Sequence, residues 1–258
     1  MHLLIYGPGR LGGAIALAST DAGWTPTLVG RPGTSGVREP APLAEVVVEA
    51  SAGPAVAGNV AHALAAGNRR FVLAASAWEA DLPRVRALLL EHDAAAVVAP
   101  NLALGAAIFL RLVEQAAALY ARAGGFEPSV VEWHRRGKAD RPSGTARHIA
   151  RRITAADPRW AGPDETGDPR PALEVVGIRA GVAPGTHQVT FDGPGESVEL
   201  RLTARDRTAY ADGAVAAARW LTRGGRAPGL HPFDAVVDDL LAAAPPPVAA
   251  PPPVATPA

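Results

Sequence analysis

The first residues of the chain constrain its fold more than any other stretch. A short apolar run, His2 to Tyr6, leads into Gly7-Pro8-Gly9-Arg10-Leu11-Gly12-Gly13, and a helical pattern follows from Ala14 to Ala22. This is G-x-G-x-x-G between a strand and a helix, the context in which the motif binds a dinucleotide. Its glycines permit a tight turn, and the helix N-terminus receives a pyrophosphate. An ordinary glycine-rich turn is the alternative. The context favours a cofactor site built from Gly7, Pro8, Gly9, Arg10, Leu11 and Gly12.

Strand and helix patterns continue to alternate as far as Ala99. The run 44–50 is almost continuously apolar, as expected for a parallel strand that is covered on both faces. Further strands are predicted at 71–75 and 95–99, each after a helical pattern. This order predicts a Rossmann-like, doubly wound α/β sheet, which binds its ligand at the carboxyl ends of the strands. The residues at those ends are Ala74, Ala75, Ser76, Ala99, Pro100, Asn101 and Leu102.

The end of the second predicted strand, 25–30, bears on the choice of cofactor. A cofactor without a 2′-phosphate usually meets an acidic residue here, hydrogen-bonded to the ribose. The chain has Arg31 at this point, and its next acidic residue is Glu39. Arg31 is placed to bind a 2′-phosphate, which favours NADPH. Because arginine is common in loops, binding of NADH stays an alternative.

The pattern changes after residue 105. A long apolar helix, 105–123, precedes strands near 173–178, 187–191 and 197–204, whose alternation is typical of an antiparallel sheet with one wetter face. Two helices, 210–221 and 233–241, then return to the first domain. We predict a dinucleotide-binding domain of residues 1–105 and 209–241, and an inserted α+β substrate domain of residues 106–208 with a mainly antiparallel sheet. Residues 242–258 are predicted to be a disordered Ala/Pro tail.

Composition excludes several classes of partner and site. The formal net charge is zero, which argues against a general nucleic-acid or membrane-surface binder. There are no cysteines, and the histidines outside the motif described next lack ligand spacing, so we expect no metal. No apolar run reaches about 20 residues without a polar interruption. The chain runs straight into a strand, without room for a signal peptide. We therefore expect a cytoplasmic protein.

One polar stretch, 132–146, carries the candidate chemistry. Lysine and arginine together number 25, and Lys138 is the only lysine. Arginine provides charge but cannot release a proton near neutral pH, so a single lysine four residues after His134 suggests that the amine is needed. The alternative is a chance survivor on a polar loop. Pro142-Ser143-Gly144-Thr145 then opens a helix, predicted from Thr145 to Ile153, whose N-terminus is a candidate anion site.

The run His-Arg-x-x-Lys-x-Asp-x-Pro-Ser-Gly-Thr-Ala, residues 134–146, closely resembles the signature of the 4-hydroxy-tetrahydrodipicolinate reductase (dihydrodipicolinate reductase) family. The resemblance extends loosely over residues 1 to about 240. It implies hydride transfer from NAD(P)H to a cyclic dicarboxylate imine, on the diaminopimelate–lysine route. His134 and Lys138 are the implied catalytic residues, and Arg135, Ser143, Gly144 and Thr145 the implied substrate ligands. A homotetramer built through the second sheet is also implied.

The sequence departs from the family pattern at two places. Arg135 stands where the family has a second histidine, although an arginine fork can bind a carboxylate. Residues 74–76 read Ala-Ala-Ser where the family has Gly-Thr-Thr, and Leu102 replaces an aromatic residue against the nicotinamide half. Two alternatives therefore stay open. Instead of the implied activity, the protein could be a diverged reductase of another small carboxylate or a catalytically silent NADPH-binding regulator, and retention of both His134 and Lys138 argues against the second.

Overall fold

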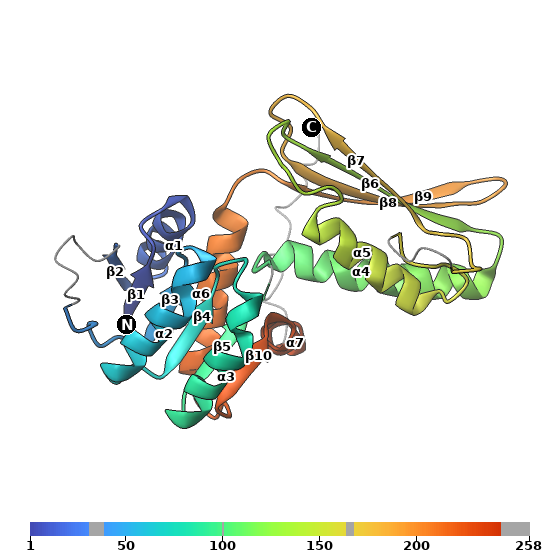
Figure 1. Cartoon of the computed structure of the whole chain (residues 1–258). Helices are drawn as coiled ribbons and strands as arrows, with labels where there is room; N and C mark the ends of the chain where they lie inside the picture. The colour runs from blue at the N-terminus through green and yellow to red at the C-terminus, as the bar shows by residue number, and fades with distance from the viewer. Residues whose placement is uncertain (31–38, 100, 164–167, 244–258) are drawn as a thin grey trace, which may run out of the picture.

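The computed structural model describes residues 1–30, 39–99, 101–163 and 168–243, and Arg31 and Pro100 lie outside them. These residues form a six-stranded and a four-stranded sheet, each packed against helices (Figure 1). The first sheet has the strand order β10-β5-β4-β3-β1-β2, with all pairs parallel. Its strands are β1 (His2–Tyr6), β2 (Thr25–Val29), β3 (Val46–Glu49), β4 (Arg70–Leu73), β5 (Ala95–Val98) and β10 (Gly229–Pro232).

Helices cover both faces of the first sheet, because its strands are apolar on both sides. On one face, α1 (Arg10–Asp21), α6 (Thr208–Thr222) and α7 (Phe233–Ala242) pack on Leu3, Ile5 and their neighbours. On the other, α2 (Val56–Ala65) and α3 (Leu82–Glu91) pack on Leu4 and Tyr6. Short 3-10 turns, η1 (Gly53–Ala55) and η2 (Glu79–Asp81), precede α2 and α3. The predicted doubly wound sheet is confirmed.

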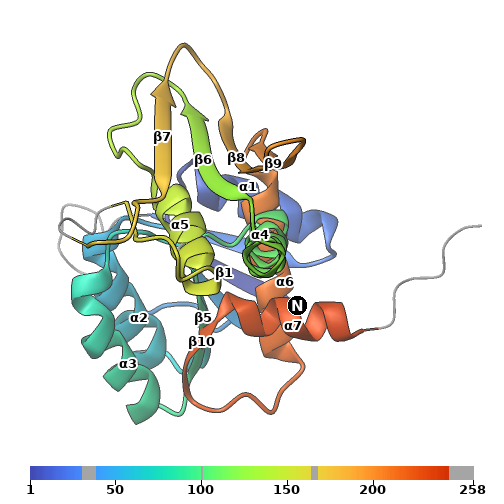
Figure 2. The ribbon, with the colours of Figure 1, turned by 90° about the vertical axis from the view of Figure 1, so that its right-hand side faces the viewer.

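The second sheet has the order β7-β6-β8-β9. Its strands are β6 (Glu127–His134), β7 (Glu174–Arg179), β8 (Gly185–Asp192) and β9 (Ser197–Ala204). The β6–β8 and β8–β9 pairs are antiparallel, whereas β6 and β7 are parallel, so the sheet is mixed and mainly antiparallel. One face packs on α4 (Leu104–Ala123) and α5 (Gly144–Ala156), and Figure 2 shows these two helices side by side below the strands of the second sheet.

The long helix α4 is apolar enough, by length and composition alone, to cross a membrane, with a mean hydropathy of 1.4 over its 18-residue window. Arg111 and Glu114 interrupt its apolar run. Phe109, Val113 and Ala117 are buried in the core beneath the second sheet, so this helix contributes to packing inside the protein.

The chain returns to the first domain through α6, which packs on α1 and on β3, β4 and β5. Strand β10 was not predicted, because Gly-Leu-His-Pro is short and has no strand pattern. β10 is an edge strand of the sheet that the described residues form, so its terminal Pro232, which lacks an N–H, is tolerated there. The boundaries at residues 105/106 and 208/209 stay a prediction, and the predicted tail lies outside the described residues from residue 244 onward.

A glycine in α6 fixes the approach of this returning helix to the cleft. A Cβ built on Gly213 would lie 1.6 Å from the carbonyl oxygen of Leu102. We expect Gly213→Ala to lower the free energy of unfolding by about 3 kcal/mol, the upper end for overpacking, because the obstacle is backbone. Gly58→Ala is the matched control: Gly58 lies in α2 with open space around it, and alanine there should be neutral or stabilising. Urea unfolding measures both, and equal stabilities would contradict the expectation.

Candidate active site

The glycine-rich turn between β1 and α1 has the geometry of a dinucleotide cradle. Gly7 has φ +96°, and a Cβ on it would lie 2.6 Å from the carbonyl oxygen of Ala50. Gly12 is buried, and a Cβ there would lie 1.9 Å from the oxygen of Gly7. No side chain of the described residues caps α1, so its first N–H groups are left for a ligand. The turn also lies where the strand order reverses, between β1 and β3, which is where such sheets bind their cofactor.

A cleft of about 570 Å³ runs from this turn to the second sheet. It brings together predicted cofactor residues from three strand ends: Arg10, Leu11, Ala74, Ser76, Ala99, Asn101 and Leu102. Pro8 and Gly9 are exposed on the turn itself. Ala75 lines an adjoining hollow of about 540 Å³. Arg31 and Pro100 fall outside the described residues, so their predicted roles rest on the sequence alone.

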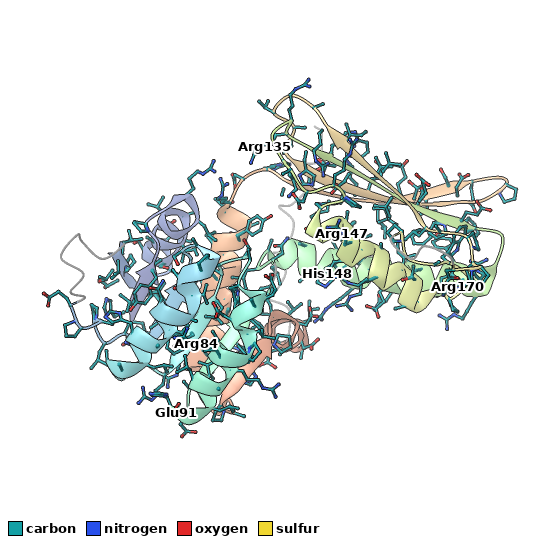
Figure 3. All side chains as sticks on the ribbon, viewed as in Figure 1. Arg84, Glu91, Arg135, Arg147, His148 and Arg170 are labelled. Atoms are coloured by element: carbon teal, nitrogen blue, oxygen red, sulfur yellow. The ribbon has the colours of Figure 1, made fainter. Side chains whose placement is uncertain are left out.

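The polar stretch after β6 faces the same cleft from the second domain. His134, Arg135 and Lys138 line the cleft, and Arg135 lies exposed at the end of the second sheet (Figure 3). Lys138 also lines the adjoining hollow, together with Ser143, Gly144 and Thr145. The predicted catalytic pair and the predicted anion site therefore meet at Lys138. Its Nζ lies 2.6 Å from Oδ1 of Asp140.

Helix α5 begins one residue earlier than predicted, at Gly144, and Ser143 is its N-cap. The Oγ of Ser143 accepts a hydrogen bond from Ala146 N, and the N–H of Ser143 donates one to Glu132. Both the hydroxyl and the N–H of Ser143 therefore already have partners within the protein. Partial burial works to raise the pKa of Asp140. The hydrogen bond from Lys138, its positive charge, and hydrogen bonds from backbone N–H groups that include Gly144 outweigh this effect of burial. The pKa of Asp140 therefore lies below its ordinary value. The N-terminus of α5 thus already stabilises a carboxylate.

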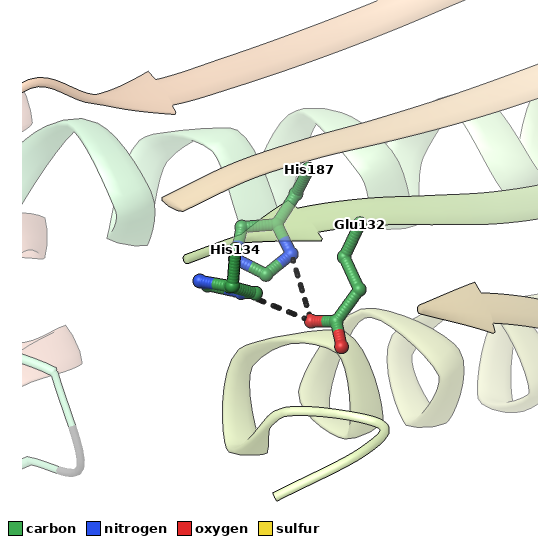
Figure 4. Close-up of side chains that lie close together, drawn as sticks. All are labelled: Glu132, His134 and His187. Atoms are coloured by element: carbon green, nitrogen blue, oxygen red, sulfur yellow. Dashed lines mark hydrogen bonds and ion pairs between the residues drawn. The ribbon is translucent and has the colours of Figure 1, made fainter. Parts of the chain in front are cut away.

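Behind His134 lies a buried polar cluster that was not predicted as a site (Figure 4). Alternation along β6 places Val130, Glu132 and His134 on the face toward α4 and α5. Nε2 of His134 lies 3.2 Å from Oε2 of the fully buried Glu132, and Nδ1 of His187 lies 3.8 Å from the same oxygen. Oε1 accepts from Arg179 at 2.7 Å. No signal in the sequence indicated that His187, which was interpreted as structural, would lie beside this carboxylate, and the fold brings it there.

The ligand atoms of Glu132, His134 and His187 lie within 4.8 Å of one another, a spacing that a metal ion could use. No metal was predicted, because His187 lies on a different strand, β8, far along the sequence from Glu132 and His134 on β6. Arg179 already supplies a positive charge to the carboxylate, and Lys138 adds another nearby. These charges favour a hydrogen-bonded carboxylate over a cation site.

The surroundings of His134 in the fold shift its pKa. Burial lowers its pKa, Glu132 works to raise it, and the positive charges of Lys138 and Arg179 lower it further, so that the pKa lies below the ordinary value. The ring is therefore mostly neutral at neutral pH. Nε2–H of His134 donates to Glu132, which leaves Nδ1 as the second ring nitrogen. Nδ1 lies close to Gly185, since a Cβ built on that glycine would be 3.4 Å from it.

The buried His187 should make stability depend on pH. Burial, then the charge of His134, lowers its pKa to about 4. The unfolded chain takes up this proton first, so the stabilising contribution is complete above about pH 6.5 and is lost as the pH falls toward 4, at up to about 1.4 kcal/mol per pH unit. Urea unfolding at pH 7.5 and 5 should show a smaller loss in His187→Asn than in the unchanged protein. Equal losses would show that His187 does not carry this effect.

Other residues of the cleft were also missed. Arg205 and Arg207 line it from the segment that joins β9 to α6, and Tyr210 lines it from the first turn of α6. Only the register of the sheets and the path of α6 bring them there, so the sequence pattern held no signal for them. For Glu132 a signal existed: an acidic residue occupies an inward position of an otherwise apolar strand, and such a charge needs partners when it is buried.

The first sheet has the fold and the glycine-rich turn of a dinucleotide-binding domain, and the second domain presents the predicted acid/base pair to the cleft and the predicted anion site to the adjoining hollow. This division defines an oxidoreductase that uses a nicotinamide cofactor. Comparison with known proteins then specifies the family. The profile described as dihydrodipicolinate reductase, C-terminus, matches residues 105–237. The chain belongs to the 4-hydroxy-tetrahydrodipicolinate reductase family.

Individual relatives agree with this assignment. The chain is 38% identical over 183 residues to a 4-hydroxy-tetrahydrodipicolinate reductase of Myxococcus xanthus, covering 67% of this chain and 65% of the relative. It is 33% identical over 198 residues to that of Archaeoglobus fulgidus, covering 74% and 75%. A dipicolinate-bound dihydrodipicolinate reductase from Paenisporosarcina sp. TG-14 has the same fold, with a TM-score of 0.67 at 17% identity over 90% of this chain and 97% of that one.

Proposed function

We propose that the protein reduces 4-hydroxy-tetrahydrodipicolinate to tetrahydrodipicolinate, with loss of water, on the diaminopimelate–lysine route. Family membership supports this substrate. The observation that carries the proposal is the meeting of the dinucleotide turn, the His134–Lys138 pair and the α5 N-terminus in adjoining hollows. A cyclic imine with two carboxylates needs all three: a hydride, a proton and anion ligands.

When bound, the nicotinamide supplies the hydride. Gly7, Gly9 and the N-terminal turn of α1 would hold the pyrophosphate, and Ser76 and Asn101 lie at the strand ends nearer the second domain. The residues therefore fit a dinucleotide that would extend from the turn into the cleft. Ser76 and Leu102, which stand where the family has larger residues, would face the nicotinamide half.

His134 and Lys138 provide the proton that the reduction consumes. Lys138 is a compact ammonium at the junction of the two hollows. His134 is mostly neutral in the free protein, but the negative charges of a dicarboxylate beside it raise its pKa and favour the protonated ring. The two residues therefore act together on the bound substrate.

The two substrate carboxylates have separate ligands. Gly144 and Thr145 at the α5 N-terminus take one, in the place where the Asp140 carboxylate is stabilised, and Ser143 holds this turn in position. Arg135 takes the other through its fork, in place of the second histidine of the family. Lys138 contacts the carboxylate at α5 once Asp140 releases it.

The test is an assay of NADPH oxidation by purified protein with enzymatically generated 4-hydroxy-tetrahydrodipicolinate. Turnover that depends on both components supports the proposal, and tight cofactor binding without turnover would contradict it. One second candidate is favoured by Arg135 and by Ala74-Ala75-Ser76: a reductase of another small carboxylate on the same scaffold. A panel of small cyclic and linear imino acids in the same assay distinguishes the two. Binding of NADPH with no turnover on any of them would favour the silent regulator.

We propose NADPH as the preferred cofactor, on the basis of Arg31 and the absence of an acid before Glu39. Arg31→Ala should narrow the difference between NADPH and NADH affinity by about 1–3 kcal/mol, the contribution of a charge-assisted hydrogen bond to phosphate. Fluorescence titration with both nucleotides measures it. Equal affinities in the unchanged protein, not altered by the substitution, would rule the preference out.

We further propose a cytoplasmic homotetramer that assembles through the second sheet. One face of this sheet packs on α4 and α5, whereas the other carries the partly exposed Trp133 of β6 and Val176 of β7, which is 41% exposed. Arg201 lies over the ring of Trp133, 5.8 Å from its centroid. Sedimentation velocity of the unchanged protein and of Val176→Asp tests the assembly, and a monomer in both would exclude it.

A further inference from the structure

We infer that Glu132 is the positioning residue of the site: its carboxylate holds the ring of His134 and the N-terminus of α5 at a fixed separation. The inference rests on the proposed function for its kinetic consequence, whereas the geometry behind it stands independently. Glu132 was not among the predicted site residues, and it is set back from the cleft that His134 lines.

The two oxygens of Glu132 serve different partners. Oε2 faces the ring of His134 at 3.2 Å and His187 at 3.8 Å. Oε1 accepts from the N–H of Ser143 at 2.9 Å and from Arg179 at 2.7 Å. Ser143 is the N-cap of α5, so one carboxylate joins the acid/base residue to the anion-binding turn. A movement of either group would break a hydrogen bond to a fully buried charge, which is costly.

The strands around Glu132 leave room for this arrangement at two glycines. Glu132 lies opposite Gly177 in β7 and opposite His187 in β8. A Cβ on Gly177 would lie 3.0 Å from Oε1 of Glu132, and a Cβ on Gly185 would lie 3.1 Å from Cε1 of His134. Both sides of the pair are thus bounded by backbone, and the ring has little space to turn.

The unsatisfied nitrogen of His187 points to the same carboxylate. Nδ1 of His187 is buried and has no hydrogen-bond partner among the described residues, and Oε2 of Glu132 is 3.8 Å away. The rings of His134 and His187 meet edge to face, with centroids 5.3 Å apart. A small shift of the ring would let Nδ1–H of His187 donate a hydrogen bond to Oε2 of Glu132.

This geometry has a consequence for proton transfer. A carboxylate on Nε2 fixes which nitrogen of His134 is directed away from it, and it stabilises the imidazolium that forms when the ring takes a proton. Among the described residues, the charged groups that shift the pKa of His134 are Glu132 on β6, Arg179 on β7 and Lys138 after β6, and the ring of His187 on β8 packs beside it. Arg135, Arg205, Asp206 and Arg207 line the same cleft. Glu132 is the negative group that contacts the ring. Its removal should therefore lower the pKa of His134 and loosen the ring.

The test compares the unchanged protein with Glu132→Gln, which keeps an acceptor for Ser143. We expect kcat/KM to fall by about 10- to 100-fold, as is typical for partners that orient a functional imidazole. A group that must be protonated loses its activity as the pH rises through its pKa, so this limb of the profile should move to lower pH in Glu132→Gln. Glu114→Gln is the matched control, since Glu114 also pairs with an arginine, Arg152, outside both hollows.

A second measurement does not depend on turnover. Nitrogen NMR of the His134 ring, without substrate, reports its tautomer and its pKa in both proteins. An unchanged tautomer and an unchanged pH limb in Glu132→Gln would overturn the inference even if the rate fell. If the unchanged protein shows no turnover, the proposed function fails while the NMR result still decides the role of Glu132.

Glu132→Gln leaves Arg179 buried without its counter-charge and therefore carries a risk of unfolding. The double variant Glu132→Gln/Arg179→Met removes both charges and keeps similar side-chain volumes, and it is compared with the unchanged protein. The pH limb and the His134 tautomer should change in the double variant relative to the unchanged protein. If they do not, Glu132 has only a structural role.

Discussion

Lys138→Arg is expected to lower kcat/KM by about 10²- to 10⁴-fold although it keeps the positive charge, because loss of a positioned proton donor costs about that much. Lys138 lies where the two hollows join, with its Nζ 2.6 Å from Oδ1 of Asp140 and its side chain 29% exposed. A guanidinium is larger and planar, and it does not release a proton near neutral pH. The substitution therefore removes both a compact carboxylate contact and a possible acid.

The control for this experiment is the reverse exchange at a remote site. Arg84→Lys, on the exposed side of α3 (Figure 3), should leave kcat/KM unchanged. Nucleotide affinity should be the same in all three proteins, since the cradle is at Gly7 to Gly12. Near-native turnover of Lys138→Arg would show that the single lysine is a chance survivor, and the acid/base assignment would fail with it.

His134→Gln should have an effect of similar size. Glutamine can still accept or donate a hydrogen bond near Glu132, but it cannot carry a proton to the substrate. The ring lies beside Gly185 and Glu132 in the second domain, away from the predicted cofactor cradle at Gly7 to Gly12. Cofactor affinity should therefore be preserved while turnover is lost. Steady-state kinetics beside nucleotide titration separates the two effects, and a parallel loss of NADPH affinity would point to a folding defect instead.

Combining the substitutions tests whether the two residues act as a unit. The double variant Lys138→Arg/His134→Gln should lose less than the product of the separate losses, as is usual for groups that serve one step. A fully multiplicative loss would mean that His134 and Lys138 contribute independently.

Much of the fold was predictable, because local patterns were strong. The continuous apolar runs of β3 and β4 and the amphipathic helices between them follow from burial on both faces. The strand Ser197–Ala204 was predicted with its observed bounds, because strict alternation of apolar and polar residues indicates a strand. Strand β10 and the parallel pairing of β6 with β7 depend on contacts between distant segments, for which the sequence holds no local signal.

The site divides in the same way. His134, Lys138 and the α5 turn form one contiguous stretch, so spacing and residue type were enough to propose them. Glu132 belongs to that stretch too, but its importance comes from Arg179 and His187, which reach it only through strand register. The pKa of His134 likewise could not be predicted, because burial and the charge of Arg179 are tertiary effects.

The position of β10 has a consequence for biosynthesis. Gly229 pairs with Ala95, so the nascent chain carries β5 as an open edge until the segment Gly229–Pro232 has been synthesised. An apolar edge such as Ala95–Val98 is a template for pairing with other chains. Its partner β10 comes after the whole second domain in the chain, and α7 follows β10 directly. Chaperone dependence and loss to aggregation during synthesis should therefore concentrate on chains that stop before residue 229.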